Sequence, residues 1–316
     1  MHSAQPNRLA PEWQVWAALL IVYVVWGSTY LAIRVVDETM PPLLAAGARH
    51  VSAGVIIFAL LMVTKGPRAL RLSRAEWLGA AFVGLALLLG GNGLVMLGER
   101  DVPSGLAALI IAVVPLFVVV LRRVFGERVA SGTYVGVFGG FVGMAVLIVP
   151  HGISGETNVL AMLMLVGASF SWAIGTFFSK RLTLPRDPLA STGAQMLVGG
   201  IGLAVVGTLA GEWGLVQVDH FSTDSVLALL YLIVFGSVIA YTAYTWVLQH
   251  ASVSRVSTYA YVNPVVAIVL GAAILNETVD IWIVVGAVII VIAVALVIRA
   301  EANRAPTEEI IEAEAG

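Results

Sequence analysis

Ten apolar runs, each close to the length that crosses a lipid bilayer, dominate this chain of 316 residues. A transmembrane helix needs about 20 predominantly apolar residues, and short polar segments separate these runs. The predicted spans are 14–34, 43–64, 76–97, 104–122, 132–149, 159–179, 190–210, 225–248, 254–275 and 280–298. The pattern predicts an all-α polytopic membrane protein with ten transmembrane helices.

The composition supports a bundle whose outer surface faces lipid. Apolar residues make up 59% of the chain and charged residues 11%, whereas a soluble domain has about 45–50% and about 25%. A soluble fold of this size would leave much of that apolar surface in water. These values exclude a soluble enzyme, a disordered chain and a nucleic-acid-binding protein.

The distribution of Lys and Arg predicts the orientation of the spans, because cytoplasmic loops carry an excess of both. With the N-terminus in the cytoplasm, only Arg34 and Arg100 lie in loops on the opposite side, and Arg49 lies inside a span. The other fourteen are Arg8, Lys65, Arg68, Arg71, Arg74, Arg122, Arg123, Arg128, Lys180, Arg181, Arg186, Arg255, Arg299 and Arg304. We therefore expect both termini in the cytoplasm, with an acidic tail at 299–316.

The chain shows no residue pattern of an enzyme. It has no cysteine, no zinc-protease, serine-hydrolase or phosphate-loop motif, and no histidine pair with metal-ligand spacing. With a net charge of −2, the chain has no excess of positive charge with which to bind a polyanion. We expect no catalytic residues, cofactor, metal or nucleic-acid partner, and a monomer whose partners are the bilayer and a small-molecule substrate.

The two halves of the chain resemble each other. Gly47 and Gly54 in the second span match Gly193 and Gly200 in the seventh, at an offset of 146 residues. Five spans per half is an odd number, so the second half crosses the membrane in the opposite sense. Such inverted repeats are typical of secondary transporters, with the substrate between the halves. The predicted repeats are residues 14–149 and 159–298.

Few charged residues lie near the membrane interior. Arg49 is costly to bury unless it is paired, so it either contacts an anion such as a carboxylate or forms a structural tie. Its repeat partner is Gln195, which favours a tie for one of the two. Glu127 and Glu277 follow the fourth and ninth spans, where a structural cap is favoured over proton coupling. No mid-membrane Asp or Glu is evident.

Two prolines occupy similar places in the two halves. Pro115 lies in the fourth span and Pro264, after Asn263, in the ninth. Proline removes a backbone hydrogen bond and kinks a helix. We expect both prolines to kink their helices in a way that shapes a cavity. The alternative is a static kink with no role in the cavity.

Aromatic and amide side chains are the strongest indication of substrate chemistry. Trp26 lies in the first span and matches Trp172 in the sixth. Further polar or aromatic candidates lie in the third, eighth and ninth spans: Asn92, Met96, Tyr241, Tyr244, Tyr259 and Asn263. A cavity of rings with a few amides suits a small amphipathic solute, although Trp and Tyr also collect at membrane surfaces.

These motifs resemble the drug/metabolite transporter superfamily, in its members with two EamA domains. The resemblance is carried by 25-VWGST-29, 48-AR-49, Pro115 with 126-GE-127, and 263-NP-264 with 276-NE-277. It is greatest to bacterial inner-membrane exporters of aromatic amino acids. One departure is Asn276, where the family commonly has glycine.

The resemblance implies ten helices around a central cavity lined mainly by the third, fourth, eighth and ninth spans. It selects the six candidates of those spans as substrate-binding residues and leaves Trp26 and Trp172 a rim or packing role. The predicted function is an inner-membrane secondary transporter that exports small amphipathic metabolites, foremost amino acids including aromatic ones, by alternating access. Export of drugs or other metabolites and, less favoured, a channel are the alternatives. Uniport and proton-coupled antiport both stay open.

Overall fold

The computed structural model describes residues 11–302 apart from 128, 130, 155–157, 252–255 and 257. The described chain is helical throughout and contains no strand. Nine of its helices are long and apolar enough to cross a membrane, and Val262–Ile274 is a shorter apolar helix in the predicted ninth span. The predicted fold class is confirmed. The predicted acidic tail at 299–316 lies outside the described residues beyond residue 302.

Several spans are built from consecutive segments. The elements are α1 (Glu12–Ile21), η1 (Val22–Trp26), α2 (Gly27–Asp37), α3 (Pro42–Lys65), η2 (Pro67–Leu70), α4 (Arg74–Gly84), η3 (Leu85–Gly93), α5 (Leu94–Glu99), α6 (Ser104–Ile111), α7 (Val114–Val124), α8 (Ser131–Ser154), α9 (Val159–Ser179), α10 (Pro188–Leu209), η4 (Glu212–Leu215), η5 (Val218–His220), α11 (Thr223–Tyr231), η6 (Leu232–Tyr241), α12 (Thr242–His250), α14 (Tyr259–Ile274) and α15 (Ile281–Ala302).

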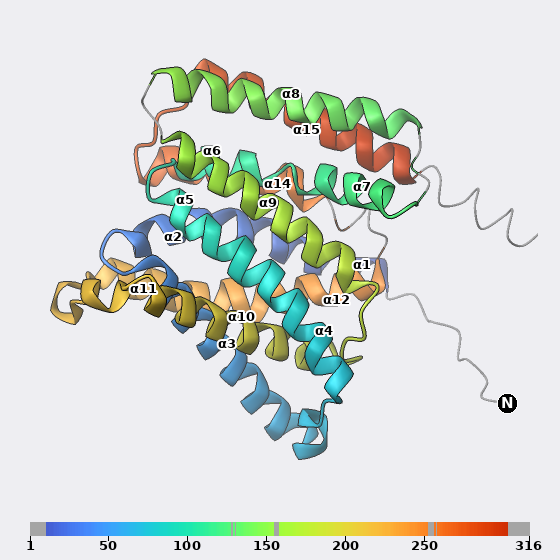
Figure 1. Cartoon of the computed structure of the whole chain (residues 1–316), viewed down its shortest axis with the longest axis vertical. Coiled ribbons are helices and arrows are strands. Elements are labelled where there is room, and N and C mark those ends of the chain that lie inside the picture. The colour runs from blue at the N-terminus through green and yellow to red at the C-terminus, as the bar shows by residue number, and fades with distance from the viewer. Residues whose placement is uncertain are drawn as a thin grey trace, which may run out of the picture.

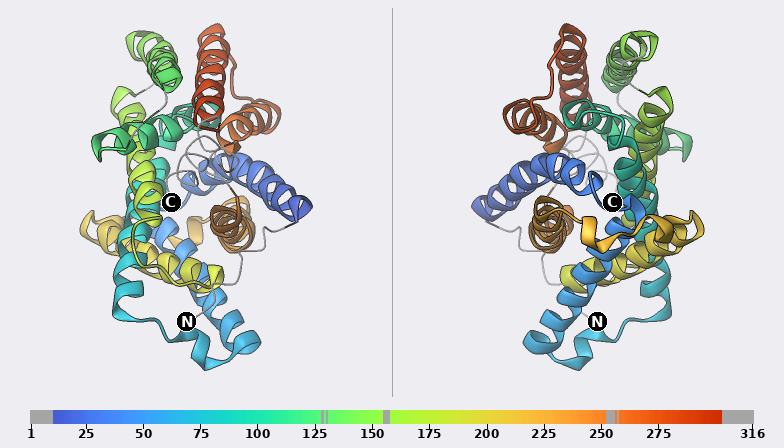
Figure 2. Two further views of the ribbon diagram at one scale, coloured as in Figure 1. Left: turned by 90° about the vertical axis from the view of Figure 1, so that its right-hand side faces the viewer. Right: turned by 90° about the vertical axis from the view of Figure 1, so that its left-hand side faces the viewer.

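Helix pairing follows the pseudo-symmetry of the repeat. Helices α3 and α10, which are the second span of each half, pack along each other, as do α8 and α15. In one contact the first span packs on the eighth through α2 and α11. The contact related to it by the repeat is that of the sixth span, α9, with η3 of the third span. Figure 1 shows α8 and α15 side by side at one edge, and in Figure 2 they stand at the top of both views, opposite the end of α3.

Glycine contacts reproduce this symmetry at single residues. A Cβ on Gly200 would lie 2.6 Å from the main-chain nitrogen of Val51, and one on Gly54 would lie 3.0 Å from that of Leu197. Val51 and Leu197 are themselves 146 residues apart. The glycines that reveal the repeat in the sequence are therefore points of close approach between α3 and α10, as small residues permit between membrane helices.

The two prolines act differently on their helices. Pro115 stands at the start of α7, and the fourth span is interrupted between α6 and α7 at residues 112–113. Proline is tolerated there because the first turn of a helix leaves its N–H groups unbonded. Pro264 instead lies inside the continuous α14.

Candidate functional site

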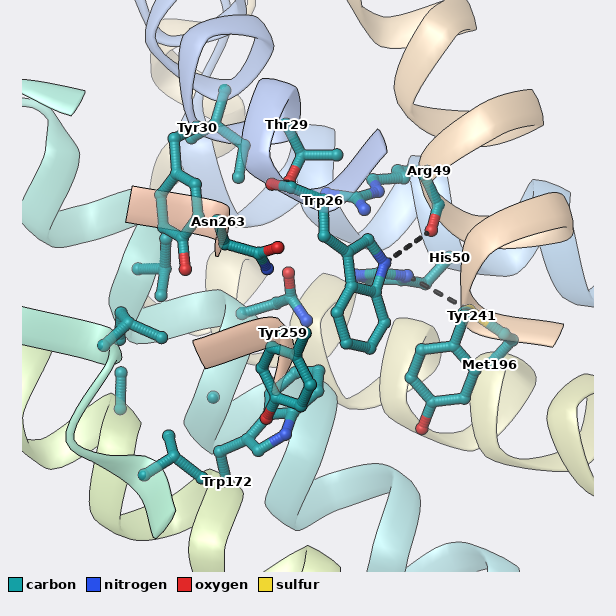
Figure 3. A pocket seen from close by; sticks show the side chains of 18 residues that line it. Trp26, Thr29, Tyr30, Arg49, His50, Trp172, Met196, Tyr241, Tyr259 and Asn263 are labelled. Atoms are coloured by element: carbon teal, nitrogen blue, oxygen red, sulfur yellow. Dashed lines mark hydrogen bonds between the residues drawn. The ribbon is translucent and has the colours of Figure 1, made fainter. Parts of the chain in front are cut away.

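A narrow inner cavity, with about 60 Å³ of space accessible to water, lies between the two halves of the bundle. Every span contributes to it except those formed by α8 and α15. Figure 3 shows the side chains converging on it. The lining residues are Trp26, Thr29, Tyr30, Ile33, Arg49, His50, Gly91, Asn92, Val95, Ile111, Val114, Ala168, Trp172, Met196, Gly236, Tyr241, Tyr259 and Asn263.

Aromatic rings form one wall of this cavity, with Trp26 at their centre. The ring of Trp26 lies 4.8 Å from Tyr244, 5.5 Å from Trp172 and 5.7 Å from Tyr259, measured between centroids. The Trp172 and Tyr259 contacts are edge to face, a favoured geometry for aromatic pairs. The resemblance implied a rim or packing role for Trp26 and Trp172, whereas the structure places both rings in the cavity wall.

Segments of π-helix carry three of the lining side chains. Trp26 ends η1, Asn92 lies in η3 and Tyr241 ends η6. A π-helical turn widens the helix and changes the direction of the side chains that follow it, and such turns are frequent at functional sites. The third and eighth spans, which carry η3 and η6, are symmetry mates. A hydropathy profile does not distinguish a π-helical turn from an α-helical one, so the sequence did not predict these segments.

Hydrogen bonds fix several of the polar side chains. The Tyr241 hydroxyl donates to Gln195 Oε1 at 2.7 Å, and Gln195 Nε2 donates to Ser191 Oγ at 2.9 Å. The Trp26 indole donates to the carbonyl of Gly236 at 3.2 Å. With its amide nitrogen turned toward the main chain, Asn263 donates to carbonyls of α14 and η1. Buried polar groups held in this way keep the aromatic wall in one arrangement.

Arg49 and His50 contribute the charged and basic groups of the cavity from α3. Arg49 is 4% exposed and its Nε donates to Ser237 Oγ at 2.9 Å. The Nδ1 atom of His50 lies 3.2 Å from the sulfur of Met196. Arg49 Nη1 and His50 Nε2 are buried without a hydrogen-bond partner. The Arg49 side chain therefore joins α3 to η6 through its bond to Ser237, while its Nη1 donor stays without an acceptor.

A second, outer cavity of about 510 Å³ lies beyond Tyr241. Tyr241 is the residue that lines both cavities, and Gln195, its hydrogen-bond acceptor, lines the outer one. Lys180 and Arg186 also line the outer cavity. Burial, together with the Arg122 guanidinium, lowers the pKa of Lys180. The phenol of Tyr241 thus stands between an aromatic inner space and a polar outer one.

At one end of the bundle, which we call the Glu277 end, carboxylates bond helix starts. The Glu277 carboxylate accepts hydrogen bonds from the main-chain N–H and hydroxyl of Ser104, at 2.8 and 2.9 Å, and from the N–H of Gly105. The carboxylate of Glu212 accepts from Leu43 and Leu44 at the start of α3. Each of these contacts joins the second repeat to the first. Glu277 has the contacts of a structural cap.

At the opposite end, which we call the Lys65 end, ion pairs join the repeats. Lys65 pairs with Asp187 at 2.5 Å. Glu127 pairs with Arg122, at 2.7 Å, and with Arg181 of the second repeat. Glu127 and Glu277 therefore both tie one repeat to the other, at opposite ends of the bundle.

The residue before each of these glutamates has a left-handed backbone. Gly126 has φ +83° and Asn276 has φ +55°. Glycine adopts this conformation without steric cost, and asparagine tolerates it better than most residues. Asn276 is thus a workable substitute for the glycine that the family commonly has.

Glu99 is a buried carboxylate that the sequence reasoning missed. It was expected in a loop after the third span, but it ends α5 with its side chain fully buried. Neither carboxylate oxygen has a hydrogen-bond partner, and the same holds for Asp37. Arg34 bonds the main-chain carbonyls of Glu99 and Arg100 rather than these side chains. Only tertiary packing decides that a charged residue at a span end is covered.

The predicted substrate-binding residues fall into three groups. Asn92, Tyr241, Tyr259 and Asn263 line the inner cavity. Tyr244 lines the outer cavity while its ring contacts Trp26. Met96 is buried at 1% exposure and lines neither cavity.

Comparisons with known proteins give the family. The model of the EamA-like transporter family matches residues 13–149 and 159–299. The inner membrane transporter YedA of Escherichia coli K12, described as uncharacterized, is 39% identical over 90% of this chain and 90% of its own. A probable amino-acid metabolite efflux pump of Salmonella typhimurium is 28% identical over 86% of this chain and 90% of its own.

A solved crystal structure supports the fold. It superposes with a TM-score of 0.64 over 91% of this chain and 98% of its own, at 16% identity. The family model covers both halves of the chain, and the chain belongs to the EamA-like transporter family of the drug/metabolite transporter superfamily.

Proposed function

We propose that this protein is an inner-membrane secondary transporter that exports small amphipathic metabolites, foremost amino acids including aromatic ones, by alternating access. The observation that carries the proposal is the inner cavity, whose wall of rings around Trp26 is interrupted by amide and guanidinium groups. Such a wall suits a solute with an apolar body and a polar head. The names of the Escherichia coli and Salmonella typhimurium relatives support the membrane and the substrate class.

The arrangement of the two cavities supports the side of the membrane to which the bundle is open. The outer cavity lies beside Lys180 and Arg186, in a segment that the distribution of Lys and Arg assigns to the cytoplasm. At the Glu277 end, hydrogen bonds from Glu212 and Glu277 join the repeats. This is the arrangement of a carrier that faces the cytoplasm and loads solute there. Rocking of one repeat against the other would then open the Glu277 end.

Counterflow in proteoliposomes tests the proposal. Vesicles containing the protein are loaded with unlabelled phenylalanine, threonine or methionine and diluted into a trace of the labelled solute. A carrier accumulates the label transiently and saturates with concentration. The absence of saturable flux for every amino acid would refute the substrate assignment. Competition by drugs or other metabolites distinguishes the alternative cargo on the same fold.

A variant pair tests whether the inner cavity is the route. Tyr259→Ala removes a ring from the cavity wall, and we expect it to reduce counterflow several-fold. The matched control is Tyr134→Ala, which removes an exposed ring from α8, a helix that does not line the cavity. Membrane insertion of both variants is checked by the yield of folded protein. Equal flux for the two variants would contradict the route.

A further inference from the structure

The guanidinium of Arg49 is buried with part of its hydrogen-bonding capacity unused. Its Nε bonds Ser237, but Nη1 is buried without a partner. An arginine side chain carries five N–H donors and no acceptor, so it requires oxygen atoms around it. A buried charge that lacks such partners is strongly destabilising. An unused donor in a cavity wall points to an acceptor supplied by the solute.

The charges around Arg49 do not supply that acceptor. Among the described residues of the helices packed against α3, the acidic side chains are Asp37 on α2, Glu99 on α5, Asp224 on α11 and Glu212 on η4. The Glu212 carboxylate already accepts from the main chain of Leu43 and Leu44. Glu99 acts on Arg49 electrostatically, but its carboxylate oxygens form no hydrogen bond and it does not line the inner cavity. Helices α10 and η6, which also pack on α3, contain no charged residue.

The lining of the cavity sets the charge and shape of an occupant. Arg49 is the one formally charged residue among the described residues that line it, and no carboxylate lines it. His50, the next residue on α3, has an unpartnered Nε2. The ring wall is formed by Trp26, Trp172 and Tyr259, and Figure 3 shows Trp26 between Arg49 and Tyr259. The cavity therefore offers one cationic group and one aromatic surface.

We propose that Arg49 binds the carboxylate of the transported solute, and that the substrate class is small monocarboxylates with an apolar or aromatic body. Guanidinium and carboxylate form charge-assisted, often bidentate hydrogen bonds. An α-amino group is tolerated against the ring faces through cation–π contact, but no acidic side chain of the lining requires it. The carboxylate is thus essential and the ammonium group dispensable. This inference rests on the proposed function, because it assigns the solute of the same cavity.

Direct binding tests the inference without depending on flux. Purified protein in nanodiscs is titrated with phenylalanine, 3-phenylpropionate and 3-phenylpropanamide, and binding is followed by isothermal titration calorimetry. The acid and the amide have the same ring and nearly the same size but differ in charge. We expect the acid to bind at least about ten-fold more tightly than the amide, as a hydrogen bond to a charged group implies. We expect phenylalanine and 3-phenylpropionate to bind within about ten-fold of each other.

Three variants isolate the role of Arg49. In Arg49→Met the preference for the acid falls to within about two-fold, while affinity for the amide is unchanged if the cavity stays intact. Arg49→Lys keeps the charge without the planar fork and retains part of the preference. The matched control, Arg68→Met, removes an exposed arginine beyond the far end of α3 and keeps the full preference.

The possible outcomes separate the inference from the proposed function. Equal binding of acid and amide by the wild-type protein overturns the inference, even if Arg49→Met fails to fold. So does a preference that survives in a folded Arg49→Met. In either case, saturable counterflow of amino acids would leave the proposed function standing. If the acid preference depends on Arg49 but no solute shows counterflow, the binding site stands and transport is refuted.

Discussion

Glu277 bonds three donors of the first repeat, so its replacement measures how strongly one carboxylate holds the repeats together. In Glu277→Ala the N–H groups of Ser104 and Gly105 and the Ser104 hydroxyl lose their acceptor, at distances of 2.8, 3.2 and 2.9 Å. A hydrogen bond to a charged group contributes about 1.5–3 kcal/mol. Because the site is half-buried and water can replace the carboxylate, we expect a total loss of about 3 kcal/mol.

The assay is reversible unfolding in mixed micelles, in which the mole fraction of SDS is raised and helix content is followed by circular dichroism. Glu277→Gln keeps one acceptor oxygen and is expected to lose about half as much stability as Glu277→Ala. The matched control is Glu76→Ala, which removes an exposed capping glutamate that bonds only Ser73 of its own helix start. That change is expected to cost about 0.5–1 kcal/mol. Equal losses for the two alanine variants would refute the reasoning.

Three further changes test other contacts. Tyr241→Phe removes the hydrogen bond to Gln195. It should lower the unfolding free energy by about 1–2 kcal/mol in the same assay, and an unchanged value would count against a structural role for this bond. Gly200→Val brings a side chain against the main chain of Val51 and should reduce the yield of folded, monodisperse protein in size-exclusion chromatography, whereas a wild-type yield would contradict the close approach of α3 and α10. Asn276→Gly should keep or slightly raise the free energy of unfolding and Asn276→Val should lower it by about 1–2 kcal/mol, because φ is +55° there. The opposite order would show that the backbone is not left-handed.

The sequence by itself determined the architecture of this protein. Apolar runs of bilayer length predict the spans, because burial of the backbone in lipid admits little besides helices. The matched glycines, such as Gly54 and Gly200, predict the inverted repeat and mark the close contact of α3 with α10. Four of the substrate-binding residues proposed from the sequence line the inner cavity: Asn92, Tyr241, Tyr259 and Asn263.

Tertiary structure decided which side chains of an apolar helix face the cavity rather than lipid or a neighbour. Trp26 and Trp172 enter the cavity wall, while Met96 does not. Glu99 is covered at the end of α5 although its place in the sequence suggested a loop. The physical reason is that hydropathy sums over all sides of a helix. In spans that are apolar on every side, only the neighbouring helices and the π-helical turns fix the direction of each side chain.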